Sequence, residues 1–231
     1  MKNIFIRCSK KLAGYHHALP LIVYGIIYLI WFRQLETNVT GNYHVIHMAA
    51  DDYIPFCEIF IIPYMLWFVY VSAVVAYFFF KDREDYYKTC AFLFTGMTIF
   101  LIVSTIWPNG HHLRATVSLE DNIFSRMVEL LWSIDTPTNL WPSIHVYNSL
   151  GAHFAIIRSK SFENRPGIRT ASLLLASSII ASTMLIKQHS VFDVTTAFIM
   201  AAIMYLIIYR YDIIVLVRMA YKRRKAASQI A

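Results

Sequence analysis

Six long apolar runs constrain the fold of this chain more than any other feature of its sequence. Crossing roughly 30 Å of hydrocarbon takes about 20 helical residues, and fewer where the helix ends are polar. The runs occupy residues 17–35, 54–80, 89–107, 143–157, 170–186 and 190–209. Since 58% of the 231 residues are hydrophobic, more than in a typical soluble domain, we expect an all-α, polytopic membrane protein. Residues 1–231 would form a single membrane domain, a bundle of six transmembrane helices.

The fourth run is the least hydrophobic of the six, because it contains His145, Asn148 and His153. The long loop before it contains a further segment, residues 119–134, with apolar residues at about helical spacing. They are Ile123, Met127, Leu130, Leu131 and Ile134. We expect this segment to form an amphipathic helix on the membrane surface, between the third and fourth spans.

The placement of Lys and Arg predicts the orientation, because cytoplasmic loops carry an excess of both residues. With the N-terminus in the cytoplasm, all but four of the 21 Lys and Arg residues fall on the inner side. The outer four are Arg33, Arg114, Arg126 and Lys187. We therefore expect a multi-pass protein of the cell membrane with both termini cytoplasmic and a basic cytoplasmic tail at 210–231. The polar segments 107–117 and 186–193 would then be extracytoplasmic.

The net charge of +7 favours anionic membrane lipids over nucleic acid as partners, because the basic residues flank the apolar runs. The cysteines Cys8, Cys57 and Cys90 lie far apart and lack the CxxC spacing of ligand pairs. We therefore expect neither a disulfide framework nor a zinc site. The sequence does not specify an oligomeric state.

His189 and Asp193 have the spacing of neighbours on one helix face, provided that the helix has begun by His189. A carboxylate there can fix the imidazole tautomer and leave the other ring nitrogen as a free lone pair. Such a histidine can act as a nucleophile or general base. The alternative is an interfacial histidine that merely hydrogen-bonds a neighbour. An ionisable residue inside an apolar span is nevertheless a candidate functional residue.

His145 follows Pro142 and Ser143 at the predicted start of the fourth span. Proline suits a first helical turn, and backbone N–H groups there, with the serine hydroxyl, can bind an anion. An imidazole beside a bound anion could protonate a leaving oxygen. The alternative is a helix cap next to a surface histidine.

Arg114 and Lys187 are outer cations that could hold a phosphate, the first with two parallel hydrogen bonds and the second as a point charge. Each could also be an ordinary snorkelling residue. His111 and His112 could suggest a metal site, but adjacent histidines rarely converge on one ion, and no carboxylate cluster accompanies them. We expect no metal and no cofactor.

Two motifs resemble the type 2 phosphatidic acid phosphatase superfamily. PSIH at 142–145 is similar to the family motif PSxH. STMLIKQHSVFD at 182–193 resembles S-R-x5-H-x3-D, with Ser182, His189 and Asp193 in register. Arg114 would correspond to the arginine of the family motif K-x6-RP. The resemblance covers roughly residues 54–210.

The chain departs from that family at three positions. Trp107 stands where the first motif has lysine, Ala115 where it has proline, and Thr183 where the third motif has arginine. Two phosphate-binding cations are therefore replaced. The NLWPSIH and KQH contexts are more similar to the branch that includes inositol phosphorylceramide synthase-like proteins.

The resemblance implies a hydrolase with an extracytoplasmic site and a phosphohistidine intermediate. His189 would attack phosphorus, Asp193 would orient its ring, and His145 would protonate the leaving oxygen and then activate water. Four residues would bind the phosphate oxygens, whose charge grows in the transition state. These are Arg114, Ser143, Lys187 and Ser182.

The expected function is a metal-independent lipid phosphatase in lipid metabolism, acting on phosphatidate-like lipids or polyprenyl (di)phosphates. Two alternatives stay open. One is a headgroup phosphotransferase similar to inositol phosphorylceramide or sphingomyelin synthases. The other is a non-catalytic transporter or scaffold whose polar groups line a cavity. An acyl substrate would also suit a His–Asp pair, but no serine or cysteine nucleophile is evident.

Overall fold

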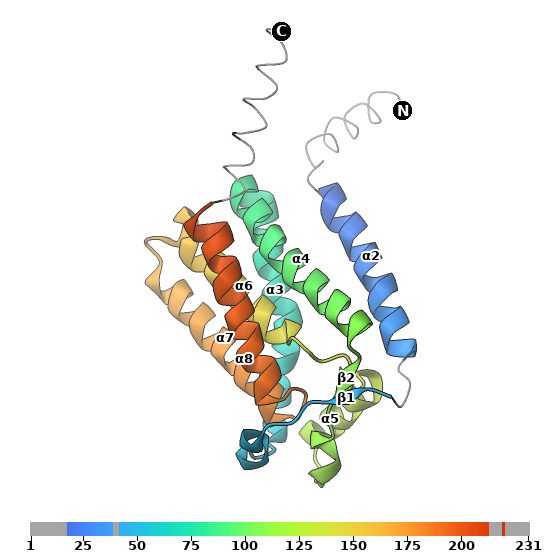
Figure 1. Ribbon diagram of the computed structural model, residues 1–231. Coiled ribbons are helices and arrows are strands. Elements are labelled where there is room, and N and C mark those ends of the chain that lie inside the picture. The colour runs from blue at the N-terminus through green and yellow to red at the C-terminus, as the bar shows by residue number, and fades with distance from the viewer. Residues whose placement is uncertain (1–17, 39–41, 213–218, 220–231) are drawn as a thin grey trace, which may run out of the picture.

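The computed structural model describes residues 18–38, 42–212 and 219 of the chain, and its architecture is all-helical (Figure 1). The α-helices are α2 (Ala18–Thr37), α3 (Ile61–Lys81), α4 (Arg83–Ile106), α5 (Ile123–Ile134), α6 (Ile144–Arg158), α7 (Pro166–Leu185) and α8 (Val191–Tyr205). Short 3-10 helices lie at Ala49–Tyr53, Glu58–Phe60, Leu113–Thr116 and Lys160–Phe162, and a π-helical turn at Leu206–Arg210 extends α8. The two-residue strands β1 (His44–Val45) and β2 (Asn109–Gly110) pair in parallel.

Five helices among the described residues are long and apolar enough to cross a membrane. They are α2, α3 together with the 3-10 helix before it, α4, α7, and α8 together with its π-helical extension. Many of their large apolar side chains are exposed, such as Leu29 at 65%, Val69 at 63% and Leu174 at 65%. Such a surface needs lipid rather than water around it. The chain is therefore an integral membrane protein.

Helix α6 coincides with the fourth predicted span but is not among those five. It contacts α3, α4, α7 and α8, so it lies at the centre of the bundle (Figure 1). Its 15 residues rise about 22 Å at 1.5 Å per residue. Because neighbouring helices cover α6, its polar residues do not face lipid, and hydropathy alone underrates such a helix.

Helix α4 begins at Arg83, earlier than the predicted residue 89. The side chain of Asp82 accepts hydrogen bonds from the backbone N–H groups of Glu84 and Asp85, at 2.8 and 3.0 Å. This N-cap satisfies donors that a helix start leaves free, so the helix extends beyond its apolar run. The predicted first residue of the first span and most of the basic tail predicted at 210–231 lie outside the described residues.

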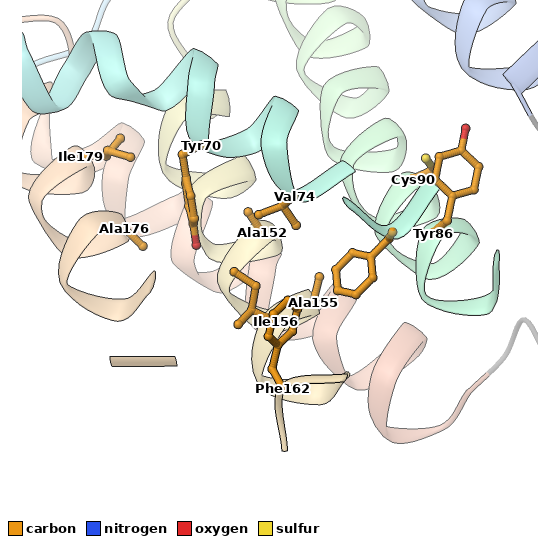
Figure 2. Packing of buried hydrophobic residues seen from close by; sticks show 11 residues of the cluster. Tyr70, Val74, Tyr86, Cys90, Ala152, Ala155, Ile156, Phe162, Ala176 and Ile179 are labelled. Carbon is orange, nitrogen blue, oxygen red and sulfur yellow. The ribbon is translucent and has the colours of Figure 1, made fainter. Parts of the chain in front are cut away.

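The half of the bundle away from α5 is packed around the second half of α6 (Figure 1). Ala152, Ala155 and Ile156 of α6 contact Tyr70 and Val74 of α3 in one buried cluster (Figure 2). Phe78, Tyr86, Cys90, Phe162, Ala176 and Ile179 complete this cluster. Small residues on α6 allow the surrounding helices to approach closely, as in other membrane bundles.

Gly96 of α4 faces the ring of Tyr147 on α6. A Cβ at Gly96 would lie 2.0 Å from Cε1 of Tyr147, and Tyr147 is fully buried with its hydroxyl donating to the carbonyl of Phe92 at 2.9 Å. We expect Gly96→Ala to destabilise the protein by about 1–3 kcal/mol, because the packed ring cannot retreat. Thermal unfolding in detergent measures this loss. Gly167→Ala is the control, since a Cβ there meets nothing within 4 Å, and an equal loss in both variants would contradict the expectation.

Helix α5 lies at one end of the bundle together with β1 and β2, whereas α2 begins and α8 ends at the opposite end (Figure 1). The helix falls within the predicted segment 119–134. Val128 is buried against α3, and an apolar stripe is exposed. That stripe contains Ile123, Met127, Leu130 and Ile134.

Candidate functional site

The connection between α7 and α8 holds His189 in place. The carbonyl of Thr183 accepts hydrogen bonds from the backbone N–H groups of Gln188 and His189, at 2.9 and 3.0 Å. Helix α8 begins only at Val191, so His189 precedes the helix and does not share a helix face with Asp193. The condition that the spacing argument required is therefore not met.

A capping box brings His189 and Asp193 together instead. Ser190 is the N-cap of α8, and Oδ2 of Asp193 accepts a hydrogen bond from the Ser190 N–H at 3.0 Å. The same oxygen lies 3.4 Å from Nδ1 of His189. In a capping box the third helical residue reaches back to the residue that caps the helix. Here the capping box also places the fully buried carboxylate of Asp193 next to the imidazole of His189.

Asp51 fixes this helix start from a distant part of the chain. Its Oδ2 accepts from the Ser190 hydroxyl at 2.6 Å and from the Met48 N–H at 2.8 Å, and its Oδ1 accepts from the Val191 N–H at 2.7 Å. Asp51 is 2% exposed. Sequence reasoning missed it, because AADDY in a loop carries no motif and nothing in it indicates a partner more than a hundred residues away.

Two contacts fix the start of α6 beside α8. Oδ1 of the buried Asn109 accepts from the N–H groups of Leu140 and Trp141, at 2.9 and 3.0 Å, which fixes the segment leading to Ser143. The Ser143 hydroxyl caps α6 by accepting from the Val146 N–H at 3.4 Å. The Ser143 N–H points to the carbonyl of Asp193 at 3.5 Å. The N-termini of the two helices therefore meet at one place, at the end of the bundle that holds α5.

His145 and His189 face each other across this junction. Nδ1 of His145 lies 3.5 Å from Nε2 of His189. If Nδ1–H of His189 donates to Asp193, Nε2 of His189 is the basic nitrogen and carries the lone pair. The His145 ring also packs against Tyr64 and Trp67, with centroid distances of 4.7 and 4.4 Å. His189 is buried, whereas His145 is partly exposed, so the cluster is open on the His145 side.

Arg114 contacts Gln188, the residue that precedes His189 in the chain. Its guanidinium donates to the side-chain oxygen of Gln188 and to the carbonyl of Asp135, the latter at 2.7 Å. It also lies 5.5 Å from the ring centroid of Trp132. Burial lowers the pKa of Arg114, and burial raises the pKa of Asp135 although Arg114 opposes that shift. Gln188 was not predicted, even though it stands inside the KQH context.

No ion pair between described residues includes Arg114. Neutral oxygens hold its guanidinium in place, and a buried charge held in this way attracts an anion. Its Nε has no hydrogen-bond partner among the described residues.

His111 is nearly fully buried, and both of its ring nitrogens have protein partners. Nε2 lies 3.0 Å from the carbonyl of Gln188, and Nδ1 accepts from the Leu113 N–H at 3.3 Å. Burial lowers the pKa of His111 to about 4, in agreement with a neutral ring that donates through Nε2. His111 thus supports the segment before His189 and offers no free nitrogen. Within the described ranges no three His, Cys, Asp or Glu residues are grouped as a metal site would require.

In the described part of the chain, the side chains of Lys187 and Ser182 bond to backbone carbonyls outside the cluster of His145, His189 and Asp193. Nζ of Lys187 donates to the carbonyls of Asp51 and Ile54, at 3.3 and 2.5 Å. The residue lines a separate cavity of about 390 Å³, together with His47, Asp52 and His112. Burial lowers the pKa of Lys187. The buried Ser182 hydroxyl donates to the carbonyl of Ile179 within α7, at 2.6 Å. Phosphate binding by these two residues stays a prediction.

Comparisons of the chain with protein-family models, with curated proteins and with solved structures found no match.

Proposed function

We propose that this protein is a metal-independent lipid phosphate phosphatase of the membrane, acting on phosphatidate-like lipids or polyprenyl (di)phosphates. One observation carries the proposal: His189 lies between the Asp193 carboxylate at one ring nitrogen and the His145 ring at the other, at 3.4 and 3.5 Å. A histidine that is oriented by a carboxylate and faces a second imidazole has the parts needed for nucleophilic catalysis with acid–base help. The resemblance to the type 2 phosphatidic acid phosphatase motifs supports the same reading.

In the proposed first step, Nε2 of His189 attacks phosphorus and the bond from phosphorus to the lipid oxygen breaks. Protonated His145 gives its proton to that oxygen, which leaves as the lipid alcohol. In the second step His145 takes a proton from water, the water oxygen attacks phosphorus, and the N–P bond breaks. Asp193 stabilises the positive charge on the ring of His189 throughout.

Charge on the phosphate oxygens would be met by Arg114 and by the first turn of α6, which begins at the buried Ser143. Both are preorganised by contacts within the protein, and donors fixed in advance are more effective than donors that must reorganise. Lys187 and Ser182 keep their predicted part only if a bound phosphate draws them away from their present partners.

The first test measures phosphate release from dioleoyl phosphatidate in lipid nanodiscs. We expect turnover without added divalent metal and no inhibition by EDTA, because the proposed chemistry uses only side chains. Loss of activity in EDTA that zinc or magnesium restores would contradict the proposal. Transfer of the phosphoryl group to an added lipid alcohol, with little free phosphate, would instead favour a phosphotransferase.

The proposal also includes the topology: six transmembrane helices with α6 as the fourth, both termini cytoplasmic, the site extracytoplasmic and α5 on the outer membrane surface. Ala115 and Ser161 are exposed residues of short 3-10 helices, the first in the connection from α4 to α5 and the second in the connection from α6 to α7. In a cysteine-free background, Ala115→Cys should react with an impermeant maleimide on intact cells, and Ser161→Cys only after lysis. The reverse pattern would contradict the orientation.

A further inference from the structure

A cavity of about 600 Å³ lies between α2, α3 and α4. This volume falls within the roughly 300–1,000 Å³ that is typical of ligand pockets. Its walls are almost entirely apolar, with Ile22 of α2, Val71 and Val75 of α3, and Leu93 and Phe94 of α4. Along α3 the lining runs from Trp67 to Phe80, about 20 Å of helix at 1.5 Å per residue. The shape suits an extended hydrocarbon chain better than a compact ligand.

The cavity ends at the candidate site. Trp67 lines it and packs against the His145 ring, with the centroids 4.4 Å apart. Asn148, one helical turn after His145 on α6, lines it as well. A hydrocarbon chain in the cavity would therefore have one end beside His145.

Two polar atoms at this end lack hydrogen-bond partners among the described residues. They are Oδ1 of Asn148, whose residue is 2% exposed, and Nε1 of Trp67. Leaving a buried polar atom unpaired costs about 1–3 kcal/mol, and here the rest of the wall is apolar. A hydroxyl or an amide N–H on an occupant can donate to Asn148, and an oxygen on the same group can accept from Trp67.

We infer that this cavity binds one hydrocarbon chain of the lipid phosphate substrate, and that Asn148 and Trp67 bind a hydroxyl or amide on the lipid backbone between chain and phosphate. The inference rests on the proposed function for the identity of the headgroup. It predicts that lipid phosphates with such a group, of which a lysophosphatidate is the simplest, bind more tightly than phosphatidate, whose ester oxygens can accept from Trp67 but which has no donor for Asn148. A polyprenyl phosphate offers no donor at this position and leaves both polar atoms unpaired.

Filling the cavity tests chain binding without any turnover. Gly25 of α2 lines the cavity, and a Cβ there meets nothing within 4 Å, so Gly25→Phe can project into the space. Gly167→Phe on α7 is the matched control, because its Cβ position is equally open and it does not line the cavity. The probe is a lysophosphatidate with a brominated chain, in nanodiscs of unbrominated lipid. Quenching of Trp67 fluorescence is taken as the difference between each protein and its Trp67→Phe counterpart.

We expect saturable quenching in the wild type and in Gly167→Phe, and at least about a 10-fold weaker affinity in Gly25→Phe. Equal quenching curves for all three proteins would overturn the inference. Quenching of the same strength by brominated bulk phosphatidylcholine would also overturn it, since the cavity would then hold any membrane lipid. Because the readout is binding, saturable quenching without phosphate release would contradict the proposed function and leave this inference standing.

The polar contact has its own test. The wild type should bind the lysophosphatidate about 10-fold more tightly than its analogue without the backbone hydroxyl, in line with one hydrogen bond to a buried acceptor. Asn148→Leu keeps the side-chain volume and should bind both lipids alike. Trp67→Phe should lose part of the preference for the lipid with the hydroxyl, measured by competition with a radiolabelled lipid. This second variant keeps the test decisive if Asn148→Leu does not fold. Equal binding of the two lipids by the wild type would overturn this part of the inference.

Discussion

His189→Gln is expected to reduce phosphate release by about 10³-fold or more, because removing a nucleophile removes the covalent route as a whole. Glutamine preserves a polar side chain of similar length, and the backbone N–H of residue 189 can still donate to the carbonyl of Thr183. The fold should therefore survive the change. The measurement is initial-rate release of inorganic phosphate from dioleoyl phosphatidate, in nanodiscs that contain equal amounts of folded protein.

Ser133→Ala is a suitable control, because Ser133 is exposed and its hydroxyl, within the part of the chain that the structure describes, bonds only to the carbonyl of Leu130 within α5. It should retain wild-type turnover. If His189→Gln keeps wild-type turnover and unfolds at the wild-type temperature, His189 is not the nucleophile. If instead the variant unfolds at a much lower temperature, His189→Asn provides a second variant for the same comparison.

Asp51→Ala is expected to cost on the order of 3 kcal/mol of stability or more, the largest structural loss that we foresee. The change leaves the buried Ser190 hydroxyl and the partly buried backbone N–H groups of Val191 and Met48 without their acceptor. Each unsatisfied buried donor costs about 1–3 kcal/mol. For a chain of this size, 3 kcal/mol corresponds to a fall of roughly 6–12 °C in the unfolding midpoint.

The neighbouring Asp52→Ala is the matched control. The Asp52 side chain is 64% exposed and, among the described residues, forms an ion pair with His47 alone at the surface, so its loss should shift the midpoint by little. The unfolding midpoint of Asp51→Asn should lie between those of Asp51→Ala and Asp52→Ala, because one side-chain oxygen still accepts while the amide nitrogen faces N–H donors. Equal midpoints for Asp51→Ala and Asp52→Ala in a thermal scan would show that Asp51 does not hold the start of α8.

The helices could be predicted from the sequence because lipid demands apolar surface along whole helical segments. The five long apolar helices follow from that pattern, and α5 follows from apolar residues at helical spacing. Helix α6 was the weakest expectation, since its polar residues contact protein and not lipid. The start of α4 was predicted too late, because an N-cap at Asp82 lies in polar sequence that hydropathy does not register.

The candidate site could be predicted only in part. The motif spacings indicated His145, His189 and Asp193, and the structure brings these three together, although by a capping box and not by a shared helix face. Asp51 and Gln188 were missed because their contacts depend on how distant segments fold onto each other. Lys187 was placed near the phosphate from its sequence position, yet its ammonium group turns to the carbonyls of Asp51 and Ile54.

The most direct test of the central claim is the identity of the residue that becomes phosphorylated during turnover. Rapid acid-free quenching after mixing with lysophosphatidate, followed by peptide mass spectrometry at alkaline pH, detects a phosphohistidine before it hydrolyses. The account predicts a phosphoryl group on the peptide containing His189 in the wild type and none on that peptide in His189→Gln. Phosphate release by the wild type with no modification of His189, or with the phosphoryl group on another residue, would contradict the account.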